Sequence, residues 1–136
     1  MVYINVLSLD RSRSTVVNIY LASLINGIAL GEVSSTIKPR FGEKKSLKNS
    51  ICACSKESFE CKFWSPILKS SHISRNFINT TSIGNFVESS KTINHSNWLR
   101  KNCKNKLVGV FLIRSFDEWS KSVLRVINKK QEGRFK

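Results

Sequence analysis

The chain alternates short apolar runs with segments whose apolar residues recur at helical spacing. Residues 2–9 are rich in β-branched side chains and bounded by polar residues, which predicts a buried strand. In residues 14–25 the apolar positions recur every three or four residues and Gly27 follows, which predicts a helix that ends near this glycine. Residues 28–30 predict a second short strand. This strand–helix–strand order indicates parallel strands joined by a crossover helix.

The second half of the chain repeats this alternation. Residues 85–88 and 107–113 predict two further strands, and residues 96–101 predict a short helix between them. Ser115 and Glu118 have the spacing of a capping box, which predicts the start of a last helix. The apolar residues on one face of that helix are Trp119, Val123, Val126 and Ile127. The pattern as a whole predicts an α/β fold with a parallel sheet.

Two segments have a weaker pattern. Residues 34–84 are dominated by Ser, Lys and Asn, and we expect a loop-rich insertion with short helices there. Residues 129–136 are polar, and we expect a frayed tail. A length of 136 residues with 40% hydrophobic content fits a single domain over residues 1–136.

The charge balance narrows the class of partner. The formal net charge is +14, from 23 Lys and Arg against 9 Asp and Glu, so the molecule attracts anions. Nucleic acid, a phosphorylated cofactor and an acidic substrate all fit this field. No apolar run is long enough to cross a bilayer, and the N-terminus lacks the pattern of a cleaved signal. We therefore expect no membrane span and a cytoplasmic location.

Polar and cationic residues follow three of the predicted strands. Residues 11–15 come directly after the first strand and before a helix, where free backbone N–H groups and the helix dipole favour an anion. Residues 89–91 follow the third strand, and Arg114 follows the fourth. In open parallel sheets, ligands bind beyond the carboxyl ends of the strands. The order of these segments predicts an anion site assembled from all three.

Five motifs, in the same order along the chain, resemble those of the sulfotransferases that use 3′-phosphoadenosine-5′-phosphosulfate (PAPS). Residues 11–17 (RSRSTVV) resemble the 5′-phosphosulfate loop, R-S-G-S/T-T-L-L, and residues 30–32 (LGE) are similar to the Gly-Glu pair that ends the next strand. Residues 52–64 resemble the C-x-C-G…C-x-F-W segment of a bacterial-type subgroup. Residues 88–91 (ESSK) resemble the D-S-S-K element, and residues 112–122 resemble the 3′-phosphate motif, L-V-R-D-P-R-x-x-x-x-S.

The resemblance covers roughly residues 4–125 and implies a P-loop NTPase-like three-layer fold. It implies an enzyme that transfers a sulfuryl group from PAPS to a hydroxyl or amine acceptor. Members of the family are usually longer, so it also implies a truncated, N-terminal half. The acceptor and the activity of so short a chain stay open.

The resemblance also implies a role for individual residues. The transfer moves a sulfuryl group, which bears developing negative charge, from one oxygen to another. Lys91 would stabilise the leaving group and Arg11 would bind the sulfuryl oxygens. Glu32 would be the general base. The implied donor-binding residues are Arg11, Ser12, Arg13, Ser14 and Thr15 at the 5′-phosphosulfate and Arg114 and Ser122 at the 3′-phosphate.

Simpler interpretations remain open for several of these residues. Glu32 also fits an exposed strand-end carboxylate, Lys91 a solvated loop residue and Ser122 an ordinary helical residue. Arg13 stands where the family often has glycine, so the loop is either distorted or supplied with a further cation.

Cysteines and histidines lie outside the donor-binding motifs. Cys52, Cys54 and Cys61 place three thiols close together, for which packing or a disulfide is preferred to zinc, and no metal is predicted. His72 and His95 lie in no family motif, and we expect both at the surface.

A second class of function also fits the composition. A small basic nucleic-acid-binding protein, for example a ribosome-associated one, would use the +14 charge for salt-sensitive phosphate contacts. The aromatic residues do not interleave with the basic ones in an RNA-binding motif. A P-loop kinase is disfavoured because the chain has no G-x4-G-K-S/T motif.

Overall fold

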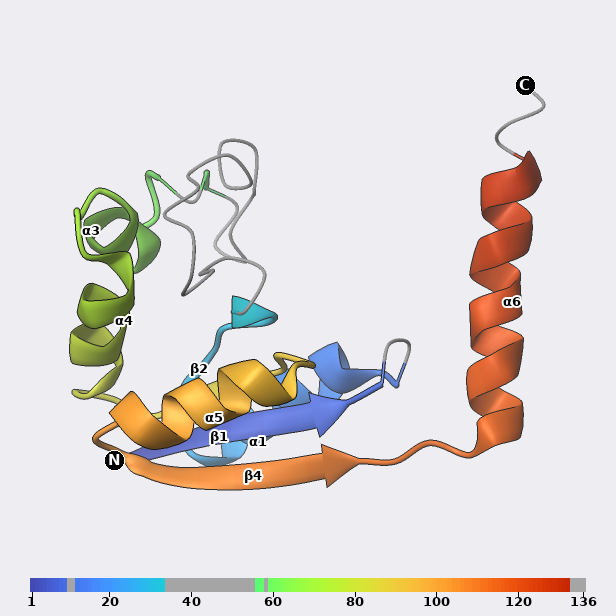
Figure 1. Ribbon diagram of the computed structural model, residues 1–136, viewed down its shortest axis with the longest axis horizontal. Helices are drawn as coiled ribbons and strands as arrows, with labels where there is room; N and C mark the ends of the chain where they lie inside the picture. The colour runs from blue at the N-terminus through green and yellow to red at the C-terminus, as the bar shows by residue number, and fades with distance from the viewer. Residues whose placement is uncertain (10–11, 34–55, 58, 133–136) are drawn as a thin grey trace.

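The sheet is parallel, as the pattern predicts. The computed structural model describes residues 1–9, 12–33, 56–57 and 59–132 (Figure 1). In these residues one sheet has the strand order β2-β3-β1-β4, with every pairing parallel. Its strands are β1 (Val2–Ser8), β2 (Ile28–Ala29), β3 (Phe86–Glu88) and β4 (Lys106–Leu112). The crossover from β1 to β2 therefore passes over β3, which pairs with both.

Strand β1 holds the sheet together because it pairs along both of its edges. Its register with β4 runs without interruption from Val2 opposite Lys106 to Ser8 opposite Leu112. On its other edge, Asn5 lies opposite Glu88. Successive side chains of a strand point to opposite faces, so β1 supplies buried residues to both faces of the sheet.

Helices cover both faces of this sheet, which gives three layers. Helix α1 (Ser14–Leu24) packs on one face, and α3 (Trp64–Leu68), α4 (Ile73–Thr81) and α5 (Ile93–Asn102) lie on the other (Figure 1). The core under α1 is formed by Ile4, Val6, Ala22 and Val87. The larger core on the opposite face includes Tyr3, Trp64, Phe77, Phe86 and Leu99.

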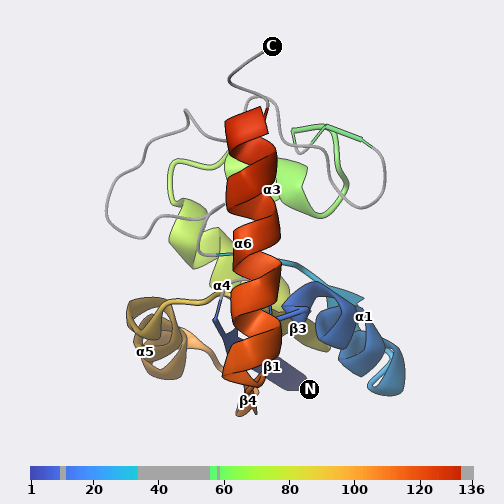
Figure 2. The ribbon, with the colours of Figure 1, turned by 90° about the vertical axis from the view of Figure 1, so that its right-hand side faces the viewer.

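Helix α6 (Phe116–Glu132) follows β4 and stands apart from the other helices (Figure 1). Its predicted apolar face belongs to neither core among the described residues. Phe116 is 77% exposed, and its ring contacts that of Trp119 at 5.9 Å between centroids. Seen from the side in Figure 2, α6 lies in front of the carboxyl ends of the strands.

Most predicted boundaries agree with the structure. Helix α5 begins at Ile93, three residues before the predicted start. Helix α6 extends through Glu132, into the segment for which a frayed tail is expected. Helices α3 and α4 lie in the segment expected to be loop-rich, most of whose first half lies outside the described residues. Within the described ranges, no helix has the length and hydropathy needed to span a bilayer.

The end of α1 is fixed by a close contact between two backbone segments. A Cβ on Gly27 would lie 2.6 Å from the carbonyl oxygen of Asn85, which accepts a hydrogen bond from the amide of Ile28 at 3.0 Å. The Asn85 side chain accepts from the Val2 amide at 2.9 Å and donates to the Ile25 carbonyl at 2.8 Å. Asn85 thus ties α1, β1 and β2 together, and glycine at position 27 permits that approach.

Gly27→Ala should destabilise the fold by about 1–3 kcal/mol, because the added methyl group meets backbone atoms that cannot move independently. The matched control is Gly109→Ala in β4, where an added Cβ meets nothing within 4 Å. The control should be neutral or slightly stabilising, since glycine is unfavourable inside a strand. Urea denaturation gives the free energy of unfolding of each variant. Equal stability of the two would contradict the close packing at Gly27.

Candidate functional site

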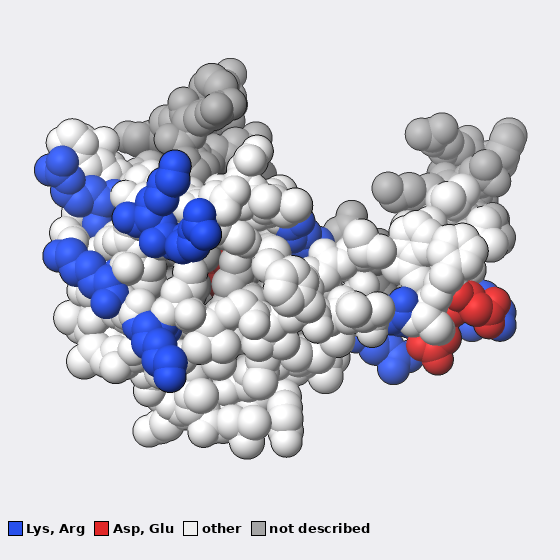
Figure 3. Space-filling model, turned by 60° about the horizontal axis from the view of Figure 1, so that its bottom comes forward, with Lys and Arg blue, Asp and Glu red and all other residues white. Residues whose placement is uncertain are grey.

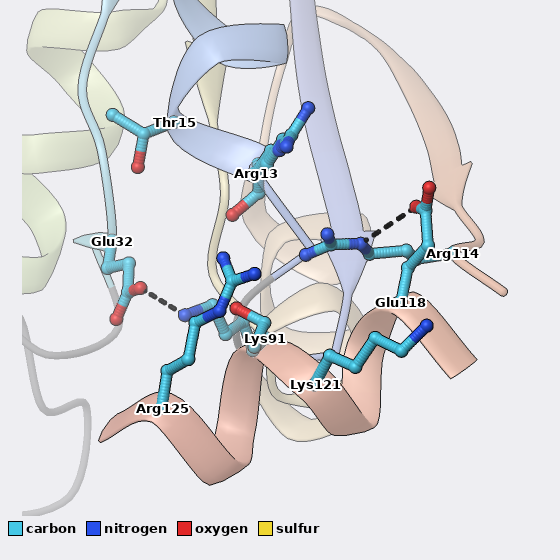
Figure 4. Close-up of a pocket in the computed structure, with 10 residues that line it drawn as sticks. Arg13, Thr15, Glu32, Lys91, Arg114, Glu118, Lys121 and Arg125 are labelled. Atoms are coloured by element: carbon cyan, nitrogen blue, oxygen red, sulfur yellow. Dashed lines mark hydrogen bonds and ion pairs between the residues drawn. The ribbon is translucent and has the colours of Figure 1, made fainter. Parts of the chain in front are cut away.

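A polar cleft of about 800 Å³ opens at the carboxyl ends of the strands (Figure 4). One wall comes from the start of α1 and from the segments that follow β2 and β3, and the other from α6. Its lining includes the predicted residues Arg13, Ser14, Thr15, Glu32, Lys91, Arg114 and Ser122. It also includes Glu118, Lys121 and Arg125, all from α6.

The structure thus brings together residues that the motifs place far apart in sequence. Of the predicted site residues that the structure describes, Ser12 is not among those that line the cleft, and it is buried, with 5% of its surface exposed. Arg11 lies outside the described residues.

The loop before α1 keeps a glycine-like backbone although it carries arginine. Arg13 is the N-cap of α1, and its φ of 61° and ψ of 26° place it in the left-handed region. Its carbonyl oxygen accepts from the amides of Val16 and Val17 at 3.1 and 3.3 Å. The structure thus places an arginine, at the lining of the cleft, in the left-handed backbone conformation that glycine adopts most readily. The amides of Ser14 and Thr15 precede these bonds, so they have no acceptor within the helix and lie at the positive end of the helix dipole.

Glu32 and Lys91 form an ion pair in the cleft. The Lys91 ammonium nitrogen lies 2.5 Å from Glu32 Oε1, and the side chains are 23% and 47% exposed (Figure 4). The amide of Ser89 donates to the carbonyl of Gly31 at 2.8 Å, which ties the two segments together beside the pair. Gly31 adopts a φ of 70°, and the chain then turns into Glu32. A candidate base and a candidate leaving-group cation therefore face each other directly.

Arg114 and Glu118 form a second ion pair on the opposite wall. Arg114 Nε lies 3.2 Å from Glu118 Oε2, with Arg114 16% and Glu118 66% exposed (Figure 4). The amide of Glu118 donates to Ser115 Oγ at 3.4 Å, which confirms the predicted cap of α6. An exposed carboxylate is a weak partner for a shielded guanidinium, so a phosphate can compete for Arg114.

Two cations of the cleft were missed in the sequence. Lys121, which pairs with Asp117 at 2.8 Å, and Arg125 lie on the same side of α6 as Ser122. Their spacing from Glu118, three and seven residues, is the signal that a helical projection would have given. In the described residues, five cationic side chains and two carboxylates line the cleft, so its field favours anions.

The structure overturns the expectation that His95 lies at the surface. His95 is 3% exposed, and its Nε2 lies 3.0 Å from Oε2 of the fully buried Glu88. The early start of α5 makes this contact, because it places His95 and Leu99 one turn apart on the buried side of the helix. Burial, together with the nearby Glu88 carboxylate, raises the pKa of the Tyr3 hydroxyl. His72 is exposed, as predicted.

The cysteines lie away from the cleft as far as the structure describes them. Cys61 is buried in the larger core with Trp64, and Cys52 and Cys54 lie outside the described residues. Burial raises the pKa of the Cys103 thiol, which disfavours the reactive thiolate. In the part of the chain that the structure describes, no group of His, Cys, Asp and Glu side chains is suited to hold a metal.

Comparisons with protein-family models, with curated proteins and with solved structures found no match to this chain. The cleft is therefore interpreted from its own geometry. The N-terminus of α1 and the Lys91–Glu32 ion pair lie on one wall of the cleft, and the Arg114–Glu118 ion pair lies on the other.

Arg13→Ala and Arg13→Gly should separate the cation of this loop from its backbone. Both variants remove the cation and should weaken the binding of inorganic sulfate at the start of α1. Arg13→Gly should be the more stable of the two by about 1 kcal/mol, because alanine keeps the left-handed strain and glycine relieves it. Thermal unfolding and calorimetric titration measure the two effects. If Arg13→Gly were the less stable variant, the left-handed N-cap would be wrong.

Proposed function

We propose that this chain is a PAPS-dependent sulfotransferase of P-loop NTPase-like fold, which transfers a sulfuryl group to a hydroxyl or amine acceptor. One observation carries the proposal. Residues of four separate motifs, represented by Arg13, Glu32, Lys91 and Arg114, line a single cleft although they are spread over most of the chain.

The start of α1 suits the 5′-phosphosulfate. The N-terminal amides of the helix and the Thr15 hydroxyl provide donors at one place, and Arg13 adds a positive charge to the same loop. No acidic residue occupies the first turn of α1, so none competes there with an anionic ligand.

The wall formed by α6 suits the 3′-phosphate. Arg114 offers a planar, forked donor, and the Ser122 hydroxyl lies two helical turns further along. Bound phosphate would displace Glu118 from Arg114, exchanging a single exposed carboxylate for a doubly charged anion.

Glu32 and Lys91 suit the transfer itself. Glu32 would take the proton of the acceptor hydroxyl as its oxygen attacks the sulfur. The bond between sulfur and the bridging oxygen then breaks, and its electron pair stays on the phosphate, where Lys91 would stabilise the charge. In the structure these two side chains form an ion pair at 2.5 Å. When PAPS binds, its phosphate would have to replace Glu32 as the partner of Lys91. The Glu32 carboxylate would then be available as the base.

A second candidate, a small basic nucleic-acid-binding protein, rests on a different surface. Arg100, Lys101, Lys104 and Lys106 are exposed near the start of β4, at the edge of the sheet opposite the cleft. No carboxylate occurs between residues 89 and 116. Figure 3 shows Lys and Arg side chains gathered at the end of the molecule away from α6. Such a patch favours phosphate backbones through salt-sensitive contacts.

Titration with 3′,5′-diphosphoadenosine should raise the melting temperature, because a ligand that binds only the folded state stabilises it. Arg114→Ala should lose most of this shift, since it removes the 3′-phosphate partner. The matched control, Arg100→Ala, lies outside the cleft and should keep the shift. No shift in the unaltered chain, together with salt-sensitive RNA binding that Arg100→Ala weakens, would instead support the second candidate.

Lys91→Ala should lower sulfuryl transfer from PAPS by about a hundredfold or more while leaving diphosphoadenosine affinity within a few fold. The reason is that the proposed contact forms as charge develops on the leaving oxygen. Transfer can be followed as diphosphoadenosine release in the presence of a mixed panel of phenols, sugars and amines. Lys106→Ala removes an exposed lysine far from the cleft and should change neither quantity. Equal losses of binding and transfer in Lys91→Ala would refute the leaving-group role.

A further inference from the structure

A buried polar cluster lies directly beside Lys91 and has no part in the proposed chemistry. Glu88 and Ser90 are fully buried and His95 is 3% exposed. Ser90 Oγ donates to Glu88 Oε2 at 2.8 Å, and His95 Nε2 lies 3.0 Å from the same oxygen. We name Glu88, Ser90 and His95 the carboxylate clamp.

The clamp connects three consecutive pieces of the chain. Glu88 is the last residue of β3, Ser90 lies in the following turn, and His95 belongs to the first turn of α5. Lys91 lies between Ser90 and α5, so the turn that carries it is held from both sides through one oxygen atom. Ser89, next to it, is held by its amide on Gly31 and by the Asn18 amide, which lies 3.5 Å from Ser89 Oγ.

The clamp is poorly explained as a stabilising contact. Burying a carboxylate is costly, and an apolar replacement of similar size is often at least as stable. Glu88 Oε1 and His95 Nδ1 have no hydrogen-bond partner within the described structure, so the cluster is only partly satisfied. Its surroundings are mixed: the His95 ring lies 5.4 Å from that of Trp98, and the buried Tyr3 hydroxyl lies close enough to Glu88 that the carboxylate raises its pKa. What the cluster provides is a defined direction for the turn, which apolar packing would not supply.

We propose that Glu88 and His95 are positioning residues that hold the Ser89–Lys91 turn so that the Lys91 ammonium meets Glu32. The catalytic importance of this placement rests on the proposed function, in which Lys91 acts on the leaving group. The placement itself does not, because the Lys91–Glu32 pair is a property of the chain alone.

Amine labelling measures the placement without a sulfuryl donor. Brief treatment with acetic anhydride, followed by peptide mass spectrometry, reports the reactivity of Lys91 relative to the exposed Lys106. An ammonium held by a carboxylate reacts slowly, and Glu32→Gln should raise Lys91 labelling by about two- to fivefold. Glu88→Leu and His95→Leu should raise it to the same extent with Glu32 still present. Glu88→Gln and His95→Gln retain hydrogen-bonding groups and should stay nearer to the unaltered chain.

Ser90→Ala is the variant least expected to unfold the protein, because it removes one hydrogen bond of the clamp without adding bulk. It should raise Lys91 labelling while the circular dichroism spectrum stays unchanged. The proposal is overturned if folded clamp variants leave Lys91 as protected as before, if Glu32→Gln has no effect, or if Lys106 labelling rises in parallel. Diphosphoadenosine titration keeps the two hypotheses apart. Raised Lys91 labelling in a chain that binds no nucleotide would retain the clamp and reject the sulfotransferase.

Discussion

The parallel pairing of β1 with β3 on one edge and β4 on the other is the constraint on which the candidate site depends. All four strands run in one direction. The segments that follow Ser8, Ala29, Glu88 and Leu112 therefore all leave the sheet at the carboxyl ends of the strands. Each of those segments supplies side chains to the cleft. If one of the four strands were antiparallel, the segment that follows it would leave the sheet at the opposite end.

The parts of this arrangement that could be predicted are those encoded locally. A short run of β-branched residues predicts β1, and apolar residues at helical spacing predict α1. The capping residue Ser115 predicts the start of α6. Parallel pairing then follows from the crossover connection, and it brings strand-end residues such as Arg13 and Lys91 together without any knowledge of packing. The resemblance to sulfotransferases added chemical roles to these positions, and those roles stay predictions.

The parts that could not be predicted depend on packing between distant segments. His95 stands in a polar sequence, and only the docking of α5 through Leu99 shows that it is buried against Glu88. Lys121 lies within the last motif, residues 112–122, and Arg125 lies after it. Both line the cleft only because α6 lies in front of the carboxyl ends of the strands (Figure 2). Arg13 stands where the resembling motif has glycine, and glycine adopts a left-handed backbone readily. Whether arginine adopts that backbone at this position depends on the surrounding structure.

The cleft keeps its cations partly neutralised by exposed carboxylates, Glu32 on one wall and Glu118 on the other. A ligand with two separate anionic groups can displace both, whereas a ligand with one can displace only one. Calorimetric titration with 3′,5′-diphosphoadenosine and with adenosine 5′-monophosphate tests this most directly. We predict that the diphosphate binds at least about tenfold more tightly, because its 3′-phosphate gains a charge-assisted contact with Arg114. Equal affinities, or no binding of either nucleotide, would contradict a PAPS site in this cleft.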